Sequence, residues 1–488
     1  MSIDISEAYL KHLQIQLPSL QLGEFIASCQ TPLRKSIRVN SLKISVADFL
    51  KRMAQYQWKF FPIPWCQEGF WIERPEAQEE SMQLGNYLEH LLGLFYIQEA
   101  SSMLPPEALI NTLQLPPELI LDVAAAPGSK TTQLIAKTHN KSLVVANELS
   151  SSRLRYLHGN LCRLGCSQNL LTHKDGREFG CLAPNTFDAI LLDAPCTGEG
   201  TIRKNHDALK NWDLNAVIEM MHLQKELIQS AFSALKPGGH LVYSTCTLSQ
   251  EENHQVCQSL LDSKAENCEI VPLNHLFEGA EKAVTSQGYL HILPHIFDSE
   301  GFFVACFKKM ASNNSLMPPT LTTGASWQPL PSKTQVALIE FLQQQFSWTL
   351  ALESKKLFMR QQDKFEEIWL FPSQINSLPQ NFPINRCGIK LGECRQKGKR
   401  FDFRLNYEFA IAFGQHFQTG CYALNTAQLE QVIQGKDVDL TETLNIKGDC
   451  LMCYQGFPVG LSRVVNMRLK NNLPRELIKD NWRVELLV

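Results

Sequence analysis

The amino-acid sequence predicts an α/β protein with a doubly wound, mostly parallel seven-stranded sheet at its centre. Between residues 119 and 309, short apolar runs alternate with longer helical patterns, which is typical of βαβ units with a sheet buried on both faces. The last two runs have no full helix between them, so an antiparallel hairpin should finish the sheet. The expected strands are 119–124, 142–148, 169–175, 187–195, 240–246, 289–294 and 301–308.

The helices of this domain follow from the spacing of apolar residues. The segment MMHLQKELIQSAFSAL, between the fourth and fifth expected strands, has apolar residues three and four positions apart. It is followed by Pro237-Gly238-Gly239, a sequence that cannot continue a helix. One amphipathic helix is therefore expected before the fifth strand.

Length and local composition divide the rest of the chain. A chain of 488 residues suggests about three domains. Residues 310–332 are rich in Pro, Ser, Thr, Asn and Gly, without helical or strand periodicity, which indicates a linker. We expect an N-terminal α/β extension that binds RNA (1–115), the sheet domain (116–310), a linker (311–332), a connecting domain (333–385) and a small β-rich module (386–488).

Composition places the protein among ordinary globular proteins. Hydrophobic residues make up 44% and charged residues 19%. The N-terminus has no secretory pattern, and the longest apolar stretch, near 91–97, is too short to cross a bilayer. Fifteen cysteines without an export signal favour a reducing, cytoplasmic setting without disulfides. A membrane partner is not expected, and the chain is expected to be a monomer.

The net charge of −3 conceals three basic segments. Lys and Arg exceed Asp and Glu by five in 34–52, by four in 387–404 and by four in 463–483. Each segment is either a solvated basic face or a contact surface for RNA phosphates. Phe401 and Phe403 in the second segment, and Tyr407 just after it, add aromatic rings as possible stacking surfaces for bases.

The turn after the first strand suggests a cofactor without phosphates. Asp122 is followed by a turn of small residues: Val123, Ala124, Ala125, Ala126, Pro127, Gly128, Ser129 and Lys130. A single glycine does not make the G-x-G-x-x-G cradle that a dinucleotide needs, and the P-loop motif is absent here. The sequence therefore disfavours NAD and excludes a P-loop at this position.

Carboxylates at the ends of the following strands fit S-adenosylmethionine instead. Ligands of a parallel sheet bind at the carboxyl ends of its strands. Glu148 follows Gly128 by 20 residues, a spacing suited to ribose hydroxyls, while Asp175 would accept from the adenine amino group. Asp193 would lie near the methionine end. A single carboxylate at a strand end is commonly an ordinary loop residue, but these carboxylates follow consecutive strands.

Two cysteines end neighbouring central strands. Cys196 follows the fourth strand in DAPCTG, and Cys246 follows the fifth in STCT. Most of the other cysteines are expected to be buried and inert. Cys450 and Cys453 have metal-like spacing, but no matching Cys or His pair accompanies them, so we expect no metal.

A thiol beside a methyl donor suggests methylation at carbon 5 of a pyrimidine. That carbon becomes nucleophilic enough only after a thiolate adds to carbon 6. A second acid or base is then useful for releasing the product. The attacking cysteine also needs an electropositive setting, for which Lys130 is a candidate.

These motifs resemble the NOL1/NOP2/Sun family of RNA cytosine-C5 methyltransferases. The matching segments span about 270 residues in order. They are RVNSLK (38–43), YIQEASSM (96–103), LDVAAAPGSKTTQL (121–134), ANELSSSRLRYLHGNLCRLG (146–165), FDAILLDAPCTGEGTIRKN (187–205), YSTCTLSQEEN (243–253) and PHIFDSEGFFVACF (294–307). The resemblance implies a Rossmann-like class I methyltransferase fold that uses S-adenosyl-L-methionine.

The resemblance also implies roles for individual residues. Cys246 resembles the nucleophile of the family, and Cys196 resembles the thiol that assists product release. Cys196 remains the rival nucleophile, because DNA cytosine-C5 methyltransferases attack with the Pro-Cys thiol. The residues that resemble the cofactor contacts are Ala124, Ala125, Ala126, Pro127, Gly128, Ser129, Lys130, Glu148, Asp175 and Asp193.

The tail suggests the substrate. Residues 448–477 resemble the PUA-like RNA-binding module of bacterial enzymes that methylate 16S rRNA. This resemblance implies cytosine 1407 of 16S rRNA, within the 30S subunit, as the target. Two alternatives stay open, a tRNA cytosine-C5 methyltransferase and a non-catalytic RNA-binding ribosome assembly factor.

Overall fold

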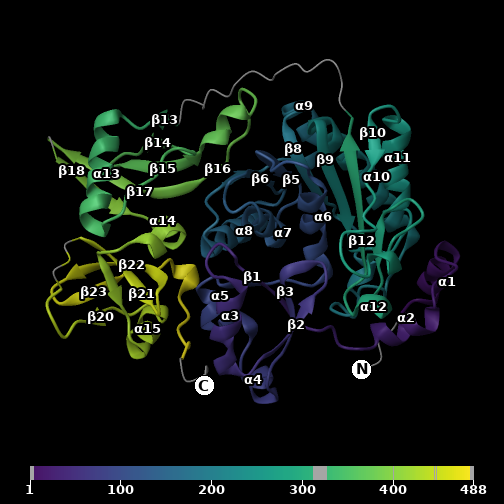
Figure 1. Ribbon diagram of the computed structural model, residues 1–488, viewed down its shortest axis with the longest axis horizontal. Coiled ribbons are helices and arrows are strands. Elements are labelled where there is room, and N and C mark those ends of the chain that lie inside the picture. Colours follow the sequence, from purple (N-terminus) through teal and green to yellow (C-terminus); the bar gives the residue numbers. More distant parts are fainter. Residues whose placement is uncertain (1–4, 311–326, 399, 445, 447, 484–488) are drawn as a thin grey trace.

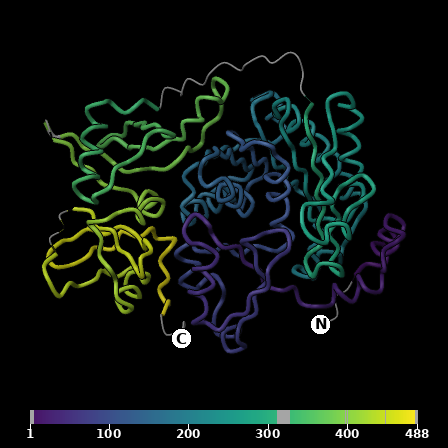
Figure 2. Tube along the Cα trace, viewed as in Figure 1, coloured from purple at the N-terminus to yellow at the C-terminus, as the bar shows by residue number. Residues whose placement is uncertain are grey.

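The computed structural model describes residues 5–310, 327–398, 400–444, 446 and 448–483. Figure 1 shows a central sheet domain, a smaller domain beneath it built from the N-terminal residues, and two sheets from the C-terminal residues at one side. Figure 2 shows the same arrangement along the chain trace. Among the described residues, no helix is both long enough and apolar enough to span a membrane. Residues 311–326 of the predicted linker lie outside the described residues.

The central sheet contains all seven predicted strands. Its order is β10-β12-β9-β8-β5-β6-β7-β16, and β11 pairs with β12. The five strands from β7 to β9 are parallel, whereas β11 and β12 form the predicted antiparallel finish. The strands are β5 (Leu119–Asp122), β6 (Leu143–Asn147), β7 (Asn169–Thr172), β8 (Phe187–Asp193), β9 (Leu235–Thr245), β10 (Cys268–Ile270), β11 (Leu290–Ile292), β12 (Phe302–Lys309) and β16 (Arg386–Cys387). The doubly wound prediction is confirmed, with short edge strands β10 and β16 added.

Helices cover both faces of this sheet, which explains its nearly continuous apolar strands. All residues of β5, β6 and β7 are buried. The predicted amphipathic helix is α10. The helices and turns of the domain are η3 (Ser101–Met103), α6 (Leu104–Thr112), α7 (Ser129–Lys137), α8 (Ser151–Leu164), η4 (Gly176–Glu178), α9 (Phe179–Leu182), η5 (Glu199–Thr201), α10 (Leu214–Ala234), α11 (His254–Ser263), η6 (Ala280–Lys282) and α12 (Pro294–Phe297).

Residues before the central sheet form a separate four-stranded antiparallel sheet, in the order β2-β3-β1-β4. The predicted basic strand begins as β1 and is buried throughout. The α/β extension is therefore confirmed as a fold. Its elements are α1 (Glu7–Gln16), α2 (Leu22–Cys29), β1 (Ser36–Val39), α3 (Val46–Met53), η1 (Ala54–Tyr56), β2 (Lys59–Ile63), β3 (Cys66–Glu73), α4 (Glu76–Ser81), η2 (Leu84–Asn86), α5 (Leu88–Leu91) and β4 (Phe95–Ile97).

A five-stranded sheet, β13-β14-β15-β17-β18, follows the predicted linker. It includes strands on both sides of the 385/386 boundary that we expected. Strand β16, between β15 and β17 in sequence, leaves this sheet and pairs with β7 of the central sheet. The elements are β13 (Gln328–Pro329), α13 (Ser332–Phe346), β14 (Lys355–Gln361), β15 (Glu366–Pro372), η7 (Ser373–Ser377), β17 (Ile389–Lys397), β18 (Arg400–Leu405) and α14 (Tyr407–Phe413).

The last sheet, β19-β21-β22-β23-β20, is the predicted β-rich module. It packs against the N-terminal domain in a shared apolar core that includes Phe49, Leu88, Leu429 and Trp482. The indole of Trp482 donates to the carbonyl of Asn86 at 2.8 Å. The elements are η8 (Gly414–His416), β19 (Cys421–Ala423), α15 (Thr426–Ile433), β20 (Val438–Asp439), β21 (Asp449–Tyr454), β22 (Phe457–Val465), β23 (Arg468–Asn471) and η9 (Arg475–Leu477).

Candidate active site

The two predicted cysteines meet at the carboxyl ends of β8 and β9. The sulfur atoms of Cys196 and Cys246 are 3.2 Å apart and within hydrogen-bonding distance. The hydrogen bond to Cys246 and burial both raise the pKa of Cys196 well above its ordinary value. Cys196 therefore keeps its proton at neutral pH.

A buried carboxylate, which the sequence did not single out, positions the loop that carries Cys196. Glu252 accepts hydrogen bonds from the backbone N–H of Thr197 at 3.1 Å and from Gln224 at 2.7 Å. The hydroxyl of Thr197 also donates to it. Glu252 is completely buried, and burial raises its pKa. Its place in STCTLSQEEN was the available signal, but only the tertiary contacts reveal its role.

A second buried carboxylate, Glu199, lies between the same two segments. It accepts from the indole N–H of Trp212 at 2.7 Å and from the backbone N–H of Leu248 at 3.3 Å. Burial raises its pKa to about 7. The next residue, Gly200, donates its N–H to the carbonyl of Cys246 at 2.9 Å. A Cβ atom at Gly200 would lie 2.2 Å from the carbonyl of Gly301, so only glycine fits there.

Lys130 supplies a positive charge beside the thiols. Its ammonium lies 2.8 Å from Asp193, donates to Ser102 at 3.0 Å, and lies over the ring of Phe302 at 5.4 Å from the centroid. Burial opposes its charged form, but Asp193 and Cys246 more than offset that effect and raise the pKa of Lys130. Lys130 therefore remains a cation close to Cys246, as the sequence analysis proposed.

The cofactor turn is fixed by close packing. Gly128 adopts a φ of +107° as it begins α7, and a Cβ atom there would lie 2.8 Å from Leu157. Asp122, at the end of β5, is buried and accepts from Thr131 at 2.6 Å. Its other oxygen, Oδ1, has no hydrogen-bond partner among the described residues. Burial raises the pKa of Asp122 to about 7.

The three strand-end carboxylates differ in their surroundings. Glu148 is buried and accepts from the N–H groups of Ala126 at 3.3 Å and Ser150 at 2.9 Å. Asp193 accepts from Ser244 at 2.8 Å. Asp175 instead caps η4 and pairs with Arg177 at 2.7 Å, which lowers the pKa of Asp175. All three lie at the same edge of the sheet as Lys130.

A further carboxylate pair also lies near Lys130. The N–H of Glu300 donates to Glu99 at 3.2 Å. Burial, as the larger cause, and the nearby carboxylate of Glu99, as the smaller one, raise the pKa of Glu300 to about 8. Glu99 also accepts from the backbone N–H of Ser102, the residue whose hydroxyl contacts Lys130. Both glutamates lie in segments that match the family, but only their proximity in the fold singles them out.

Two residues of the first basic segment are structural. Arg38 is buried and donates to the carbonyl of Ser129 at 2.7 Å and to Thr132 at 2.9 Å, which joins the N-terminal domain to α7. Lys43 donates to the carbonyls of Leu92 and Arg163 at 2.8 and 2.7 Å. Neither charge faces solvent, so interpreting the whole segment as an RNA-contacting face is wrong for these two residues.

Two residues of the second basic segment, 387–404, also make contacts within the protein. Phe403 is buried and packs 5.4 Å from Phe341. In the same segment, Lys390 is paired with Glu367 at 2.9 Å and with Glu393 at 3.1 Å. Phe403 is therefore not available to bases, which corrects that expectation.

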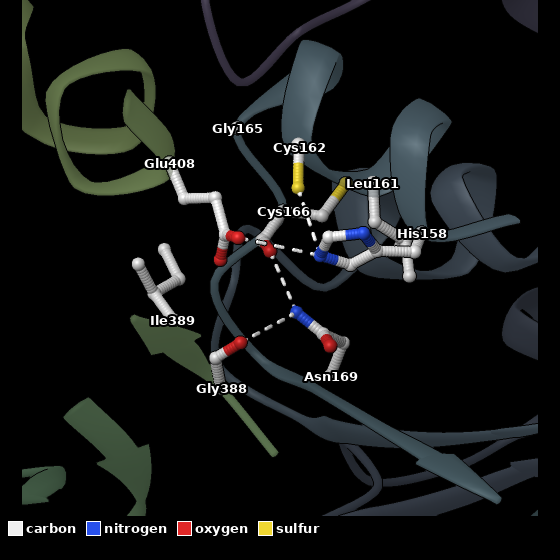
Figure 3. A pocket seen from close by; sticks show the side chains of 9 residues that line it. All are labelled: His158, Leu161, Cys162, Gly165, Cys166, Asn169, Gly388, Ile389 and Glu408. Carbon is white, nitrogen blue, oxygen red and sulfur yellow. Dashed lines mark hydrogen bonds and ion pairs between the residues drawn. The ribbon is translucent and has the colours of Figure 1, made fainter. Parts of the chain in front are cut away.

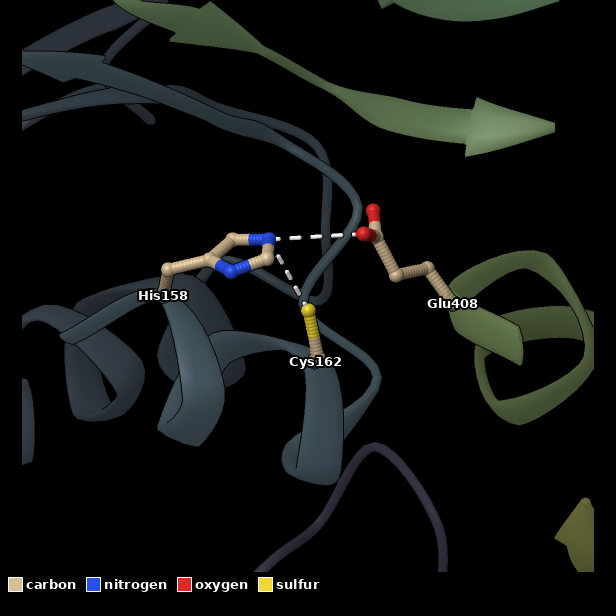
Figure 4. A group of neighbouring side chains, drawn as sticks. All are labelled: His158, Cys162 and Glu408. Carbon is tan, nitrogen blue, oxygen red and sulfur yellow. Dashed lines mark hydrogen bonds and ion pairs between the residues drawn. The ribbon is translucent and has the colours of Figure 1, made fainter. Parts of the chain in front are cut away.

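A mixed His-Cys-Glu cluster lies between α8 and α14 (Figures 3 and 4). The Nε2 atom of His158 is 3.2 Å from the sulfur of Cys162 and 3.4 Å from a carboxylate oxygen of Glu408. Arg386 donates to both oxygens of Glu408. Burial alone would raise the pKa of Glu408, but His158 and Arg386 more than offset burial and lower this pKa. Because a guanidinium already neutralises this carboxylate, we interpret the cluster as an ion-pair network that joins two domains.

Four sequence families together match most of the chain. They are the 16S rRNA methyltransferase RsmB/F family (111–308), the N-terminal domain of 16S rRNA methyltransferase RsmF (5–100), the pre-PUA domain of ribosomal RNA small subunit methyltransferase F (327–411) and the RsmF PUA domain (420–479). The PUA match confirms the predicted PUA-like module.

Two relatives that match nearly the full length of the chain indicate the same family. Ribosomal RNA small subunit methyltransferase F of Citrobacter koseri is 47% identical over 97% of this chain and 96% of its own. The Salmonella arizonae protein of the same name is 46% identical over 98% of each chain.

Solved structures match the first two domains. A methyltransferase homologue from Pyrococcus horikoshii is 34% identical, covers 63% of this chain and 96% of its own, and has a TM-score of 0.54. NSun6 from Pyrococcus horikoshii with SFG is 21% identical, covers 64% of this chain and 100% of its own, and has a TM-score of 0.54. The predicted S-adenosylmethionine-dependent methyltransferase of the NOL1/NOP2/Sun group is confirmed, and the chain belongs to the 16S rRNA methyltransferase RsmB/F family.

Proposed function

We propose that the protein transfers a methyl group from S-adenosyl-L-methionine to carbon 5 of cytosine 1407 in 16S rRNA, through a covalent bond between Cys246 and carbon 6. The observation that carries this proposal is the 3.2 Å approach of the Cys196 and Cys246 sulfur atoms beside the cation of Lys130. Two thiols and one buried cation at strand ends suit nucleophilic addition followed by elimination.

The cofactor-binding turn fits the proposed methyl donor. The turn is narrow, and its neighbours offer carboxylate acceptors for hydroxyl and amino groups instead of a cradle of amides for phosphates. S-Adenosyl-L-methionine supplies an electrophilic methyl group when it is bound. The residues that would hold it are Ala124, Ala125, Ala126, Pro127, Gly128, Ser129, Lys130, Glu148, Asp175 and Asp193.

The thiols have distinct roles in this proposal. The Cys246 thiolate forms a bond to carbon 6, and the electron pair displaced toward carbon 5 forms the new bond to the methyl carbon. The bond between that carbon and the sulfonium sulfur of the donor breaks at the same time, and its electron pair stays on the sulfur. The carbon-5 proton then leaves to a base, and the bond between Cys246 and carbon 6 breaks as the ring double bond re-forms. Cys196 is 3.2 Å from the departing sulfur and keeps a proton that can protonate it.

The domain arrangement supports a large RNA substrate. The PUA-like module and the N-terminal domain share an apolar core, so they form one continuous surface beside the catalytic domain. The names of the full-length relatives refer to the small ribosomal subunit. We infer that the monomer acts on 16S rRNA within the 30S subunit.

Mapping 5-methylcytosine in rRNA from cells with and without the gene tests this function. The expected result is the loss of one methylated cytosine at position 1407 of 16S rRNA. Methyl incorporation into 30S subunits, free 16S rRNA and tRNA should be compared with purified protein. Loss of the modification from a tRNA would contradict the substrate proposal, and failure to bind the cofactor would favour a non-catalytic assembly factor.

A further inference from the structure

A groove of about 980 Å³ runs between the catalytic domain and the sheet that follows the linker. One wall is α8, and the other is formed by β14, β15 and β16, with η9 at one end. Its lining contains four arginines and one carboxylate. They are Arg155, Arg163, Arg360, Arg386 and Glu476.

The wall formed by α8 carries two exposed side chains, Arg155 and Tyr156. Arg155 is exposed and has no hydrogen bond or ion pair within the part of the chain that the structure describes. Its neighbour Tyr156 is 71% exposed. An unpaired guanidinium beside an exposed aromatic ring offers a phosphate contact and a stacking surface in one place, the combination that single-stranded RNA requires.

The opposite wall carries two arginines that are held in place by ion pairs and by aromatic rings; Arg360 pairs with Glu367 at 2.7 Å. The guanidinium of Arg360 lies 4.8 Å from the ring centre of Trp327, and that of Arg386 lies 4.5 Å from Trp369. Arg386 also donates to Glu408. Figure 4 shows that carboxylate beside His158 and Cys162. Since the planar groups are already stacked and fixed, little conformational entropy is lost when a phosphate or a base binds there.

The groove begins next to the cofactor turn. Asn160, which lines it, donates to the carbonyl of Pro127 at 2.9 Å. Ser152 lines it as well and lies in the first turn of α8, which starts directly after the Glu148 strand end. A strand leaving the active site would reach this groove within a few nucleotides.

We propose that this groove binds a single-stranded segment of the substrate RNA adjacent to the target cytosine, with the base of one nucleotide stacked on Tyr156 and a phosphate paired with Arg155. A cytosine that is methylated must leave its stack, so its neighbours need a site that holds them apart from the helix. The proposal rests on the proposed RNA substrate and assigns a second contact site, distinct from the PUA-like module.

The test compares four variants, Tyr156→Ala, Tyr156→Phe, Arg155→Ala and Lys282→Ala. Lys282 is the matched control, because it is an exposed cation in η6, near β11 and therefore close to the edge of the central sheet that lies away from α8. Losing one stacked base weakens RNA binding by about five- to a hundredfold. Tyr156→Ala should therefore raise KM for 30S subunits or 16S rRNA within that range at nearly unchanged kcat, whereas Tyr156→Phe should remain close to the unsubstituted protein.

Arg155→Ala should weaken binding for all RNA sequences and reduce the slope of log affinity against log salt by about 0.7 to 1. Wild-type KM and salt dependence in both Tyr156→Ala and Arg155→Ala would overturn the proposal. A raised KM with an unchanged salt slope in Arg155→Ala would also overturn it, since that pattern indicates a protein contact or a folding defect.

Direct binding to 16S rRNA, measured without cofactor, separates this proposal from the proposed reaction. If the unsubstituted protein binds RNA but forms no 5-methylcytosine, the proposed reaction fails while the groove can still be judged from the variants. If the protein methylates its substrate and the four variants bind RNA equally well, the groove proposal fails alone.

Discussion

The sulfur atoms of Cys196 and Cys246 lie 3.2 Å apart, although 50 residues separate them in the chain. β8 and β9 are parallel neighbours, so their carboxyl ends bring the two following loops together. The hydrogen bond from one thiol to the other raises the pKa of Cys196 and keeps its proton in place. Because the thiolate is the nucleophile, a thiol that keeps its proton is disfavoured for attack, and this argues against Cys196 in that role.

Replacing Cys246 by alanine should abolish both the covalent adduct and turnover, because the proposed bond to carbon 6 can no longer form. Denaturing gels of protein mixed with labelled substrate RNA would detect the adduct, and cofactor binding provides the control for folding. Full activity in Cys246→Ala would exclude its role as the nucleophile.

Replacing Cys196 by alanine should instead trap the adduct. The proton donor 3.2 Å from the Cys246 sulfur would be missing, so elimination should slow by about 100-fold or more, in the range typical of general acid catalysis. A slow-migrating protein–RNA band should accumulate on a denaturing gel. If no band forms in this variant and Cys246→Ala still forms one, the two assignments must be exchanged.

Glu252 should act as a positioning residue for the Cys196 loop. In Glu252→Ala, the N–H of Thr197 and the amide of Gln224 would lose their buried acceptor. Each unsatisfied buried donor costs about 1–3 kcal/mol. We expect a lower melting temperature and a fall in kcat of at least tenfold, with little change in KM for the cofactor.

Glu252→Gln provides the comparison for that variant, since it keeps one acceptor oxygen and should recover part of kcat. Equal kcat values in Glu252→Ala and the unsubstituted protein would show that the loop holds its position without this contact.

Asp122 should make stability depend on pH. Burial raises its pKa in the folded protein to about 7, whereas in the unfolded chain the pKa is about 3.9. The folded state therefore keeps a proton that the unfolded state releases, so this stabilisation is complete below about pH 4 and is lost as the pH rises through 7. Three pKa units correspond to at most about 4 kcal/mol.

Asp122→Asn should show a smaller fall in the free energy of unfolding between pH 5 and 8 than the unsubstituted protein. Denaturant titrations at several pH values would measure it, with the exposed Asp207 changed to asparagine as the control. An unchanged pH dependence in Asp122→Asn would mean that this carboxyl is ionised in the folded protein.

Arg38→Ala should destabilise the junction between the N-terminal domain and α7. The arginine donates to Ser129 and Thr132, next to the cofactor turn, and it is 2% exposed. Each buried acceptor that loses its donor costs about 1–3 kcal/mol. Calorimetry should show a lower melting temperature, and the affinity for S-adenosyl-L-methionine should fall. A change confined to RNA binding would contradict this structural role.

The sequence by itself determined the central sheet and which residues follow its strand ends. Seven apolar runs, the small-residue turn at Gly128 and the cysteines after the fourth and fifth runs were local patterns, and the parallel sheet places all strand ends at one edge. Cys196, Cys246, Lys130 and Asp193 could therefore be identified as neighbours before their distances were known.

Only the tertiary structure decided which charged residues are free to contact RNA and which make hydrogen bonds within the protein. Arg38 and Lys43 look like RNA contacts in the sequence, yet Arg38 is buried, Lys43 is half-buried, and both donate to backbone carbonyls. Arg155 has the same side chain as Arg38, but it lies beside the groove without a hydrogen bond or ion pair to any residue that the structure describes. Burial and hydrogen-bond partners depend on residues far away in the chain, and local sequence patterns do not encode them.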